Sequence, residues 1–153
     1  VIRPLLAHPL VEYIGEIGEL EKDEFLGNAL ALLLPLDWPE PFGLVMIEAM
    51  AAGTPVIAFR CGSVPEIVED GVTGYIVRDA GEAVAAIERV PSLSRAKCRE
   101  AFDQRFTVER MCRDYLKVYE LLQAGKNLVV ASRQSASAAS KLAAEPRLAE
   151  RLS

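Results

Sequence analysis

An apolar strand, a proline-rich loop, an apolar helix and a second apolar strand follow one another early in the chain and constrain the fold most. Residues 31–36 are a continuous apolar run, which predicts a strand covered on both faces. Two prolines in the loop 38–41 end that strand, because proline has no N–H for a ladder bond. Residues 42–52 are apolar or glycine except for Glu48, which is typical of a helix inside a protein. Residues 55–59 predict the next buried strand.

Strands and helices alternate on both sides of this segment. The patterns predict strands at residues 11–15, 31–36, 55–59 and 75–77, and helices at residues 19–28, 42–52, 65–69, 79–90, 92–104 and 107–122. Such alternation predicts an α/β fold with an open, doubly wound parallel sheet of the Rossmann-like class. We expect about four parallel strands, followed by C-terminal helices.

Polar residues mark the expected starts of several helices. Ser63, with a glutamate three residues later, fits a capping box. Asp79 precedes the helix 79–90, and either Ser92 or Ser94 precedes the next one. Thr107 precedes the most regularly amphipathic helix. We expect each of these side chains to accept a hydrogen bond from a first-turn N–H.

Composition argues against several classes of protein. The hydrophobic content of 51%, with 25% charged residues, is that of a globular domain. A net charge of −5 without a basic cluster argues against a nucleic-acid partner, and no apolar run reaches the ~20 residues of a membrane span. The single histidine argues against His-based triads and most zinc sites. Three widely spaced cysteines favour a reducing, cytoplasmic setting.

Two segments differ in character along the chain. Residues 1–124 are expected to form one domain. Residues 125–153 are rich in alanine and serine and are expected to form a weakly helical tail. The chain also starts at Val1 rather than methionine, which favours a piece of a longer protein.

The expected ligand site lies beyond the carboxyl ends of the strands, where parallel sheets of this class bind ligands. A helix N-terminus near residues 42–44 points free N–H groups there, which suits a phosphate or diphosphate. Gly43 lets a ligand approach the backbone closely because it has no side chain. Gly62 lies in the loop after the next strand and is a second candidate at the same edge.

Two glutamates flank this turn. Glu40 precedes the expected helix and Glu48 lies within its first two turns, so both can face one groove. An ionised Glu48 in apolar surroundings needs an internal partner or a ligand. Carboxylates accept hydrogen bonds from hydroxyl groups, so the pair suits the hydroxyls of a sugar or a ribose. Paired carboxylates are also the catalytic groups of glycoside hydrolysis, which stays open as a second interpretation.

The sequence WPEPFGLVMIEAMAAGTPVIA at residues 38–58, followed by GSVPEIVEDGVTGYIV at residues 62–77, resembles a known family. It is similar to the C-terminal, donor-binding half of the group 1 (family 4) retaining glycosyltransferases of GT-B architecture. The likeness runs from about residue 11 to residue 122, and it implies that residues 1–124 form a nucleotide-sugar-binding, Rossmann-like domain that is incomplete at its N-terminus. Its core is a pair of glutamates separated by seven residues.

The resemblance implies a hexosyltransferase that uses a UDP-, GDP- or ADP-sugar and needs neither a cofactor nor a metal. Glu40 would be the catalytic residue near the donor sugar, and Glu48 would accept from the ribose hydroxyls. The turn formed by Phe42, Gly43, Leu44 and Val45 would present its amides to the sugar and the diphosphate. Ile17 would lie near the base, and Gly62 would complete the donor-binding set.

The resemblance also implies parts that this chain lacks. The family places an arginine and a lysine on the diphosphate, from a segment that would precede Val1. The N-terminal, acceptor-binding domain would be a further partner, so we expect the chain alone to be inactive. An exposed face or the tail would allow homo-oligomers. A nucleotide-sugar epimerase or a phosphorylase of the same architecture, and a non-catalytic interaction domain, remain alternatives.

Overall fold

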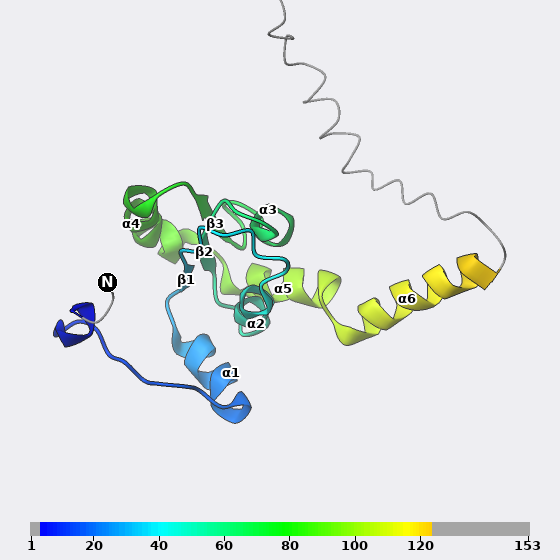
Figure 1. The fold of residues 1–153 in the computed structure, drawn as a ribbon, viewed down its shortest axis with the longest axis horizontal. Helices are drawn as coiled ribbons and strands as arrows, with labels where there is room; N and C mark the ends of the chain where they lie inside the picture. The colour runs from blue at the N-terminus through cyan, green and yellow to red at the C-terminus, as the bar shows by residue number, and fades with distance from the viewer. Residues whose placement is uncertain (1–3, 124–153) are drawn as a thin grey trace, which may run out of the picture. The chain divides into compact units, whose positions relative to one another are not determined.

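The structure is a computed structural model that describes residues 4–123. The chain divides into two compact units, Val1–Arg110 and Met111–Ser153, and the boundary falls inside helix α6 (Val108–Gln123). The first unit contains the sheet and all candidate site residues (Figure 1). The predicted tail at residues 125–153 lies outside the described residues.

The sheet has three parallel strands in the order β1 (Leu32–Leu34), β2 (Val56–Phe59) and β3 (Gly74–Val77). Val56 of the central strand lies opposite Leu32 on one side and Gly74 on the other. Three of the predicted strands are therefore present, and their parallel pairing confirms the predicted α/β class.

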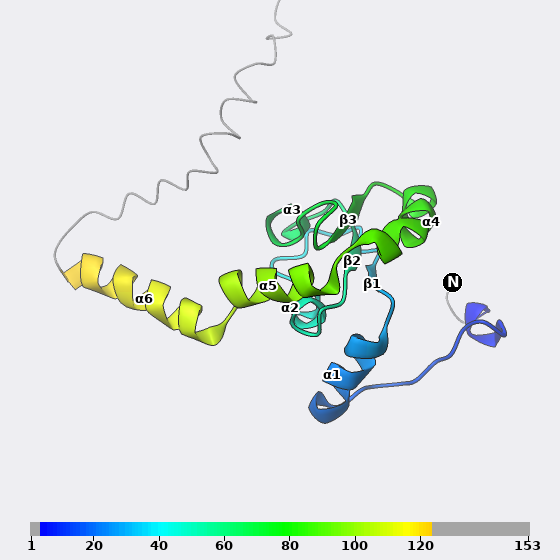
Figure 2. The ribbon, with the colours of Figure 1, turned by 180° about the vertical axis from the view of Figure 1, so that it is seen from behind.

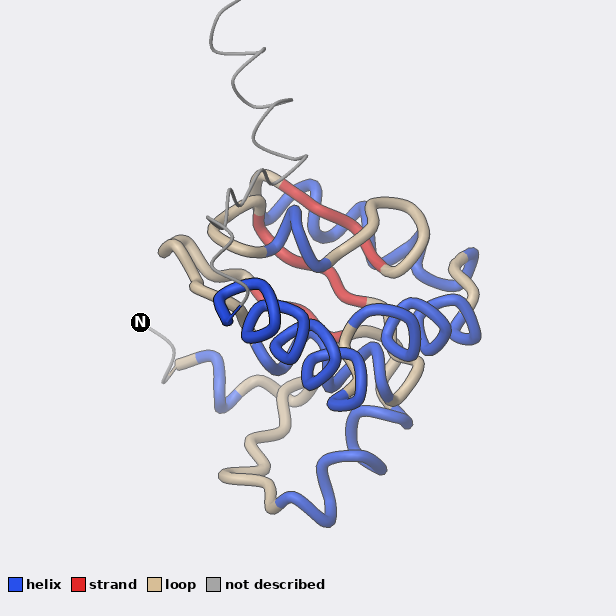
Figure 3. Tube along the Cα trace, turned by 90° about the vertical axis from the view of Figure 1, so that its right-hand side faces the viewer, coloured by secondary structure: helices blue, strands red, loops and turns tan. Residues whose placement is uncertain are grey.

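The predicted strand at residues 11–15 is wrong. This segment is loop between the short 3₁₀ helix η1 (Leu5–Ala7) and α1 (Glu19–Asn28), as Figure 3 shows. Val11, Tyr13 and Ile14 are all exposed there. A strand needs a neighbour that takes up its backbone N–H and C=O groups. No strand among residues 4–123 pairs with this segment, so its β-prone residues stay extended without a ladder.

Helices cover both faces of the sheet, because the side chains of β2 alternate between two cores. Val56 and Ala58 pack with α2 (Leu44–Ala51), α3 (Val64–Ile67) and α5 (Arg95–Arg105). Ile57 packs on the opposite face against α4 (Ala80–Arg89) and the 3₁₀ helix η2 (Val90–Ser92). Figures 1 and 2 show α2 and α4 on opposite sides of the strands. This arrangement is the doubly wound layout that the alternating sequence predicts.

Three of the predicted helix caps are confirmed. Asp79 accepts from the backbone N–H of Glu82 at 2.9 Å, and the Ser94 and Thr107 hydroxyls lie 3.4 and 3.3 Å from first-turn nitrogens of α5 and α6. The capping box at Ser63 is wrong. Its hydroxyl instead donates to the carbonyl oxygen of Phe42 at 2.8 Å. The helix α3 still begins at the next residue, so Ser63 joins two loops rather than capping a helix.

Candidate functional site

Two loops meet at the carboxyl edge of β1 and β2 and form the base of the site. Gly62 has a φ of 51°, and a Cβ at this position would come within 2.5 Å of the backbone nitrogen of Glu40. The backbone N–H of Ser63 donates to the carbonyl oxygen of Glu40 at 3.0 Å. Glycine is therefore required at position 62 for two reasons, a left-handed backbone and a close approach. The contact therefore fixes the backbone of Glu40 against the loop that follows β2.

The side chain of Glu40 folds back onto the turn before α2. Its Oε1 accepts from the N–H of Gly43 at 2.9 Å and from that of Phe42 at 3.4 Å. Gly43 has a φ of 75° and is the last residue before the helix, so α2 starts two residues later than the sequence predicts. A carboxylate at a helix N-terminus is also favoured by the helix dipole. The amides of Phe42 and Gly43, predicted to meet a sugar and a diphosphate, thus hold Glu40 in this structure.

The N–H groups of Leu44 and Val45 are the remaining donors of the turn. Both residues stand in the first turn of α2, where no intrahelical acceptor is available. The next amide, that of Met46, donates to the carbonyl oxygen of Gly43 at 2.9 Å. The two preceding amides are therefore the anion-binding groups that this helix end can offer.

Glu48 has an internal partner that the sequence reasoning missed. Its side chain is 35% exposed, and its Oε1 lies 3.0 Å from Nζ of Lys22, on the neighbouring helix α1. Lys22 also contacts Glu19 at 2.8 Å. The hydrogen bonds to Glu19 and then to Glu48 raise the pKa of Lys22, which keeps it charged. The expectation of a carboxylate that needs a partner is met by an ion pair between α1 and α2.

A signal for this partner was present in the sequence. Lys22 is the only basic residue of α1, a helix with four acidic side chains. Its side chain is only 23% exposed, so it turns toward the protein rather than to solvent. Glu48 is the only charged residue of α2. A single cation and a single anion on two adjacent helices are natural partners.

The remaining site prediction concerns Ile17. It is half-buried in the loop before α1, immediately ahead of the N-cap residue Gly18. The N–H of Gly18 donates to Glu21 at 3.3 Å, which ties this loop to the first turn of α1. Since Lys22 lies in the following turn, α1 connects the position of Ile17 to Glu48.

Basic side chains gather next to the site at the ends of the strands. A pocket of about 310 Å³ is lined by Leu36, Asp37, Phe59, Arg60, Cys61 and Arg78. Arg78 is already paired: its Nε donates to Glu82 at 2.6 Å, and this pairing raises the pKa of Arg78 and lowers that of Glu82. Arg60 is exposed. The pocket therefore has two cations, and Arg78, in the loop before α4, is already neutralised by Glu82 on that helix.

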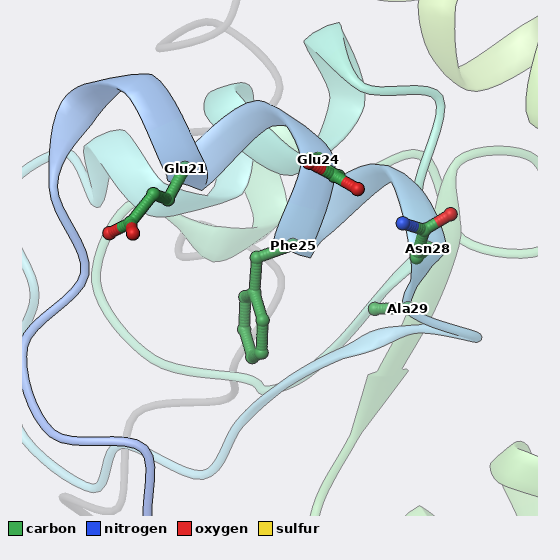
Figure 4. Close-up of a pocket in the computed structure, with 5 residues that line it drawn as sticks. All are labelled: Glu21, Glu24, Phe25, Asn28 and Ala29. Atoms are coloured by element: carbon green, nitrogen blue, oxygen red, sulfur yellow. The ribbon is translucent and has the colours of Figure 1, made fainter.

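A second pocket, of about 530 Å³, lies along α1 and does not include the candidate residues. Figure 4 shows its lining residues Glu21, Glu24, Phe25, Asn28 and Ala29. The carboxylates of Glu21 and Glu24 point in different directions, and Phe25 extends away from both. Because its polar groups do not converge, this pocket lacks the usual character of a ligand site.

Comparisons with known proteins agree with the motif. Residues 4–105 match the family model of the glycosyl transferases group 1. The N-acetyl-alpha-D-glucosaminyl L-malate synthase of Bacillus anthracis is 32% identical over 121 residues, which cover 71% of this chain and 32% of that protein. The D-inositol 3-phosphate glycosyltransferase of Streptomyces scabiei is 41% identical over 81 residues, which cover 53% of this chain and 18% of that protein.

Solved structures of glycosyltransferases also resemble this chain in fold. The sucrose-phosphate synthase of Thermosynechococcus elongatus superposes with a TM-score of 0.69 at 30% sequence identity. The match covers 82% of this chain and 33% of the synthase chain. This chain therefore spans about a third or less of the length of the relatives described. Among residues 4–123, no helix combines the length and the apolar character needed to cross a membrane.

Proposed function

Because the chain belongs to the group 1 glycosyltransferases, we propose that it is the donor-binding part of a retaining glycosyltransferase. In this proposal the enzyme transfers a hexose from a UDP-, GDP- or ADP-sugar to an acceptor hydroxyl. The observation that carries the proposal is the α2 turn, where Glu40 stands before a helix N-terminus and Glu48 stands on the same helix. Two carboxylates that can accept hydrogen bonds from hydroxyl groups, and an anion site, then lie on α2 and the turn before it.

Each part of a nucleotide sugar has a chemical counterpart in this turn. The diphosphate would accept from the N–H groups of Leu44 and Val45, where the helix dipole favours negative charge. Glu48 would accept from ribose hydroxyls, and Glu40 from hydroxyls of the sugar. The bonds from Phe42 and Gly43 end on Oε1 of Glu40, and a carboxylate has about four acceptor positions, so capacity remains for a hydroxyl donor.

The remaining candidates would complete the donor site. Ile17 would contact the base with its apolar side chain. Gly62 would hold the backbone of Glu40 in place, since a larger residue displaces it. Pairing of carboxylates with phosphate would be repulsive, so the two glutamates are suited to the two sugar rings and not to the diphosphate.

The proposed reaction replaces one bond at the anomeric carbon and keeps its configuration. The bond from the anomeric carbon to the phosphate oxygen breaks, and the acceptor oxygen bonds to the same face. The acceptor proton passes to a diphosphate oxygen, which gives the glycoside and a nucleoside diphosphate. The negative charge of Glu40 would stabilise the positive charge that develops on the sugar in the transition state. No step calls for a metal or a cofactor.

The whole protein would supply what this chain does not. We propose that an N-terminal domain binds the acceptor and that an arginine and a lysine from outside this chain neutralise the diphosphate. On this basis the chain alone is inactive. We propose that the reaction takes place in the cytoplasm. The three cysteines of this chain are free, which is compatible with a reducing setting, and nucleotide sugars are compatible with it as well.

The test is a transfer assay on the intact protein with UDP-, GDP- and ADP-glucose and with other hexose donors. Proton NMR of the product reports the anomeric configuration, which we expect to match that of the donor. Glu40→Gln should lower kcat by about two orders of magnitude, as loss of a charge that stabilises a transition state does. Glu100→Gln, an exposed glutamate of α5, is the matched control and should keep full activity.

Three outcomes would contradict the proposal. An inverted product would exclude the retaining reaction. Turnover that depends on inorganic phosphate would indicate a phosphorylase, and conversion of the nucleotide sugar to an epimer would indicate an epimerase.

A further inference from the structure

Lys22 is placed to act on the ribose subsite through Glu48. Its ammonium group reaches from α1 to Oε1 of Glu48 at 3.0 Å, across a gap of 26 positions in the sequence. It is also held from its own helix by Glu19 at 2.8 Å. Two acceptors on different helices therefore fix the position of one cation.

The exposures of the three side chains separate their roles. The Glu19 side chain is 88% exposed, that of Lys22 is 23% exposed and that of Glu48 is 35% exposed. The pair of Lys22 with Glu19 is a surface pair, of the kind that contributes little to stability. The pair of Lys22 with Glu48 lies between the helices, where a half-buried carboxylate is oriented by its partner. The second pair is the one with a consequence for the site.

We propose that Lys22 is a positioning residue, which holds the carboxylate of Glu48 in the orientation that accepts a hydrogen bond from a ribose hydroxyl of the donor. This inference rests on the proposed function and assigns a role to a residue outside the glutamate motif. Lys22 donates to Oε1, and no hydrogen bond between residues 4–123 ends on Oε2, so that oxygen stays available as an acceptor.

The same ion pair joins two subsites. Ile17 lies in the loop before α1 and Lys22 in the second turn of that helix, while Glu48 lies on α2. A bond between α1 and α2 therefore fixes the distance between the residue that would contact the base and the residue that would contact the ribose. Loss of the bond between Lys22 and Glu48 would loosen both the base contact and the ribose contact. Only the ribose contact depends directly on the orientation of Glu48.

The test uses the intact protein and compares ribonucleoside diphosphates with their 2′-deoxy and 3′-deoxy forms by calorimetric titration. Lys22→Met removes the ammonium group and keeps an unbranched apolar stem. It should weaken binding of the ribonucleotide about tenfold. It should leave the affinity for the deoxy form that lacks the contacted hydroxyl nearly unchanged, because that ligand makes no bond for Glu48 to accept.

Three further variants make the test specific. Lys22→Arg, which can still donate to Glu48, should restore most of the affinity and of the ribose preference. Lys117→Met removes a lysine with an i,i+3 partner on α6, Asp114, and should change neither. In a Glu48→Gln background, Lys22→Met should have little further effect, because coupled residues are not additive.

The outcomes separate this inference from the proposed function. If the wild-type protein binds no nucleoside diphosphate, the proposed function fails. If it binds the ribonucleotide and discriminates against the deoxy form, but Lys22→Met keeps the same discrimination, the role of Lys22 is overturned. An equal loss of affinity for both forms would make Lys22 a purely structural residue and would also overturn it.

Discussion

The contact between Gly62 and the backbone of Glu40 gives a sharp prediction about how the site is held. Gly62→Ala introduces a Cβ at a φ of 51°, close to the backbone nitrogen and carbonyl oxygen of Glu40. Gly71→Ala is the matched control, because Gly71 has a φ of 76° and nothing within 4 Å of the added Cβ. Both variants have the same left-handed backbone penalty, and only one has the collision.

The two penalties set the expected magnitudes. A left-handed backbone at a non-glycine residue costs roughly 1–2 kcal/mol, which is the full expected loss for Gly71→Ala. Overpacking against backbone adds about 1–3 kcal/mol, so Gly62→Ala should be less stable than the control by that amount. The backbone atoms of Glu40 cannot turn aside as the end of a flexible side chain can.

Amide hydrogen exchange of the intact protein provides the assay, because it reports on the site rather than on global unfolding. The N–H of Ser63 donates to the carbonyl oxygen of Glu40, and the N–H of Gly43 donates to its carboxylate. Gly62→Ala should speed exchange of both amides, and Gly71→Ala should leave both unchanged. Equal exchange at these two amides in the two variants would refute the role given to Gly62.

Three other predictions concern stability, measured as urea midpoints. Asp79→Ala removes the cap of α4 and should destabilise the protein by about 1 kcal/mol, whereas Asp79→Asn should retain most of the stability. Thr54→Val removes two hydrogen bonds of a buried hydroxyl, one donated to the carbonyl oxygen of Leu26 at 2.6 Å and one accepted from Arg95 at 2.8 Å, and should destabilise by about 1–3 kcal/mol. Hydrogen bonds from Arg78 lower the pKa of Glu82, so this carboxylate stabilises the fold above its ordinary pKa, and the effect is lost as pH falls through the folded value. Glu82→Gln should therefore lower the midpoint at neutral pH more than at acidic pH, and an equal shift at both would contradict the pairing.

The fold was predictable where the sequence pattern is local. The apolar runs that form β1, β2 and β3 are predictable from sequence because a strand covered on both faces is apolar throughout. The bounds of α1 match the prediction at both ends. The error at residues 11–15 has a non-local cause. A strand forms only where a neighbouring strand takes up its backbone hydrogen bonds. Val11 and Ile14 favour an extended backbone, but their local sequence does not show whether such a neighbour exists.

The candidate site was predictable from its motif but not from its contacts. The positions of Glu40 and Glu48 around a helix N-terminus follow from the spacing of prolines and apolar residues. The bond from Ser63 to Phe42, and the occupation of the Gly43 amide by Glu40, depend on how two loops cross. Lys22 stands out as the one cation of α1, but its pairing with Glu48, 26 positions away, depends on the packing of α1 against α2, which no local pattern gives.

The central claim is that the α2 turn binds a nucleoside diphosphate through its amides and through Glu48. Calorimetric titration of the intact protein with UDP, GDP and ADP tests it most directly, with Glu48→Gln titrated in parallel. We predict that at least one of the three nucleotides binds and that Glu48→Gln weakens its binding about tenfold, as loss of one charged acceptor does. Absence of binding of all three nucleotides to the folded protein, or equal affinity of the wild type and Glu48→Gln, would contradict the claim.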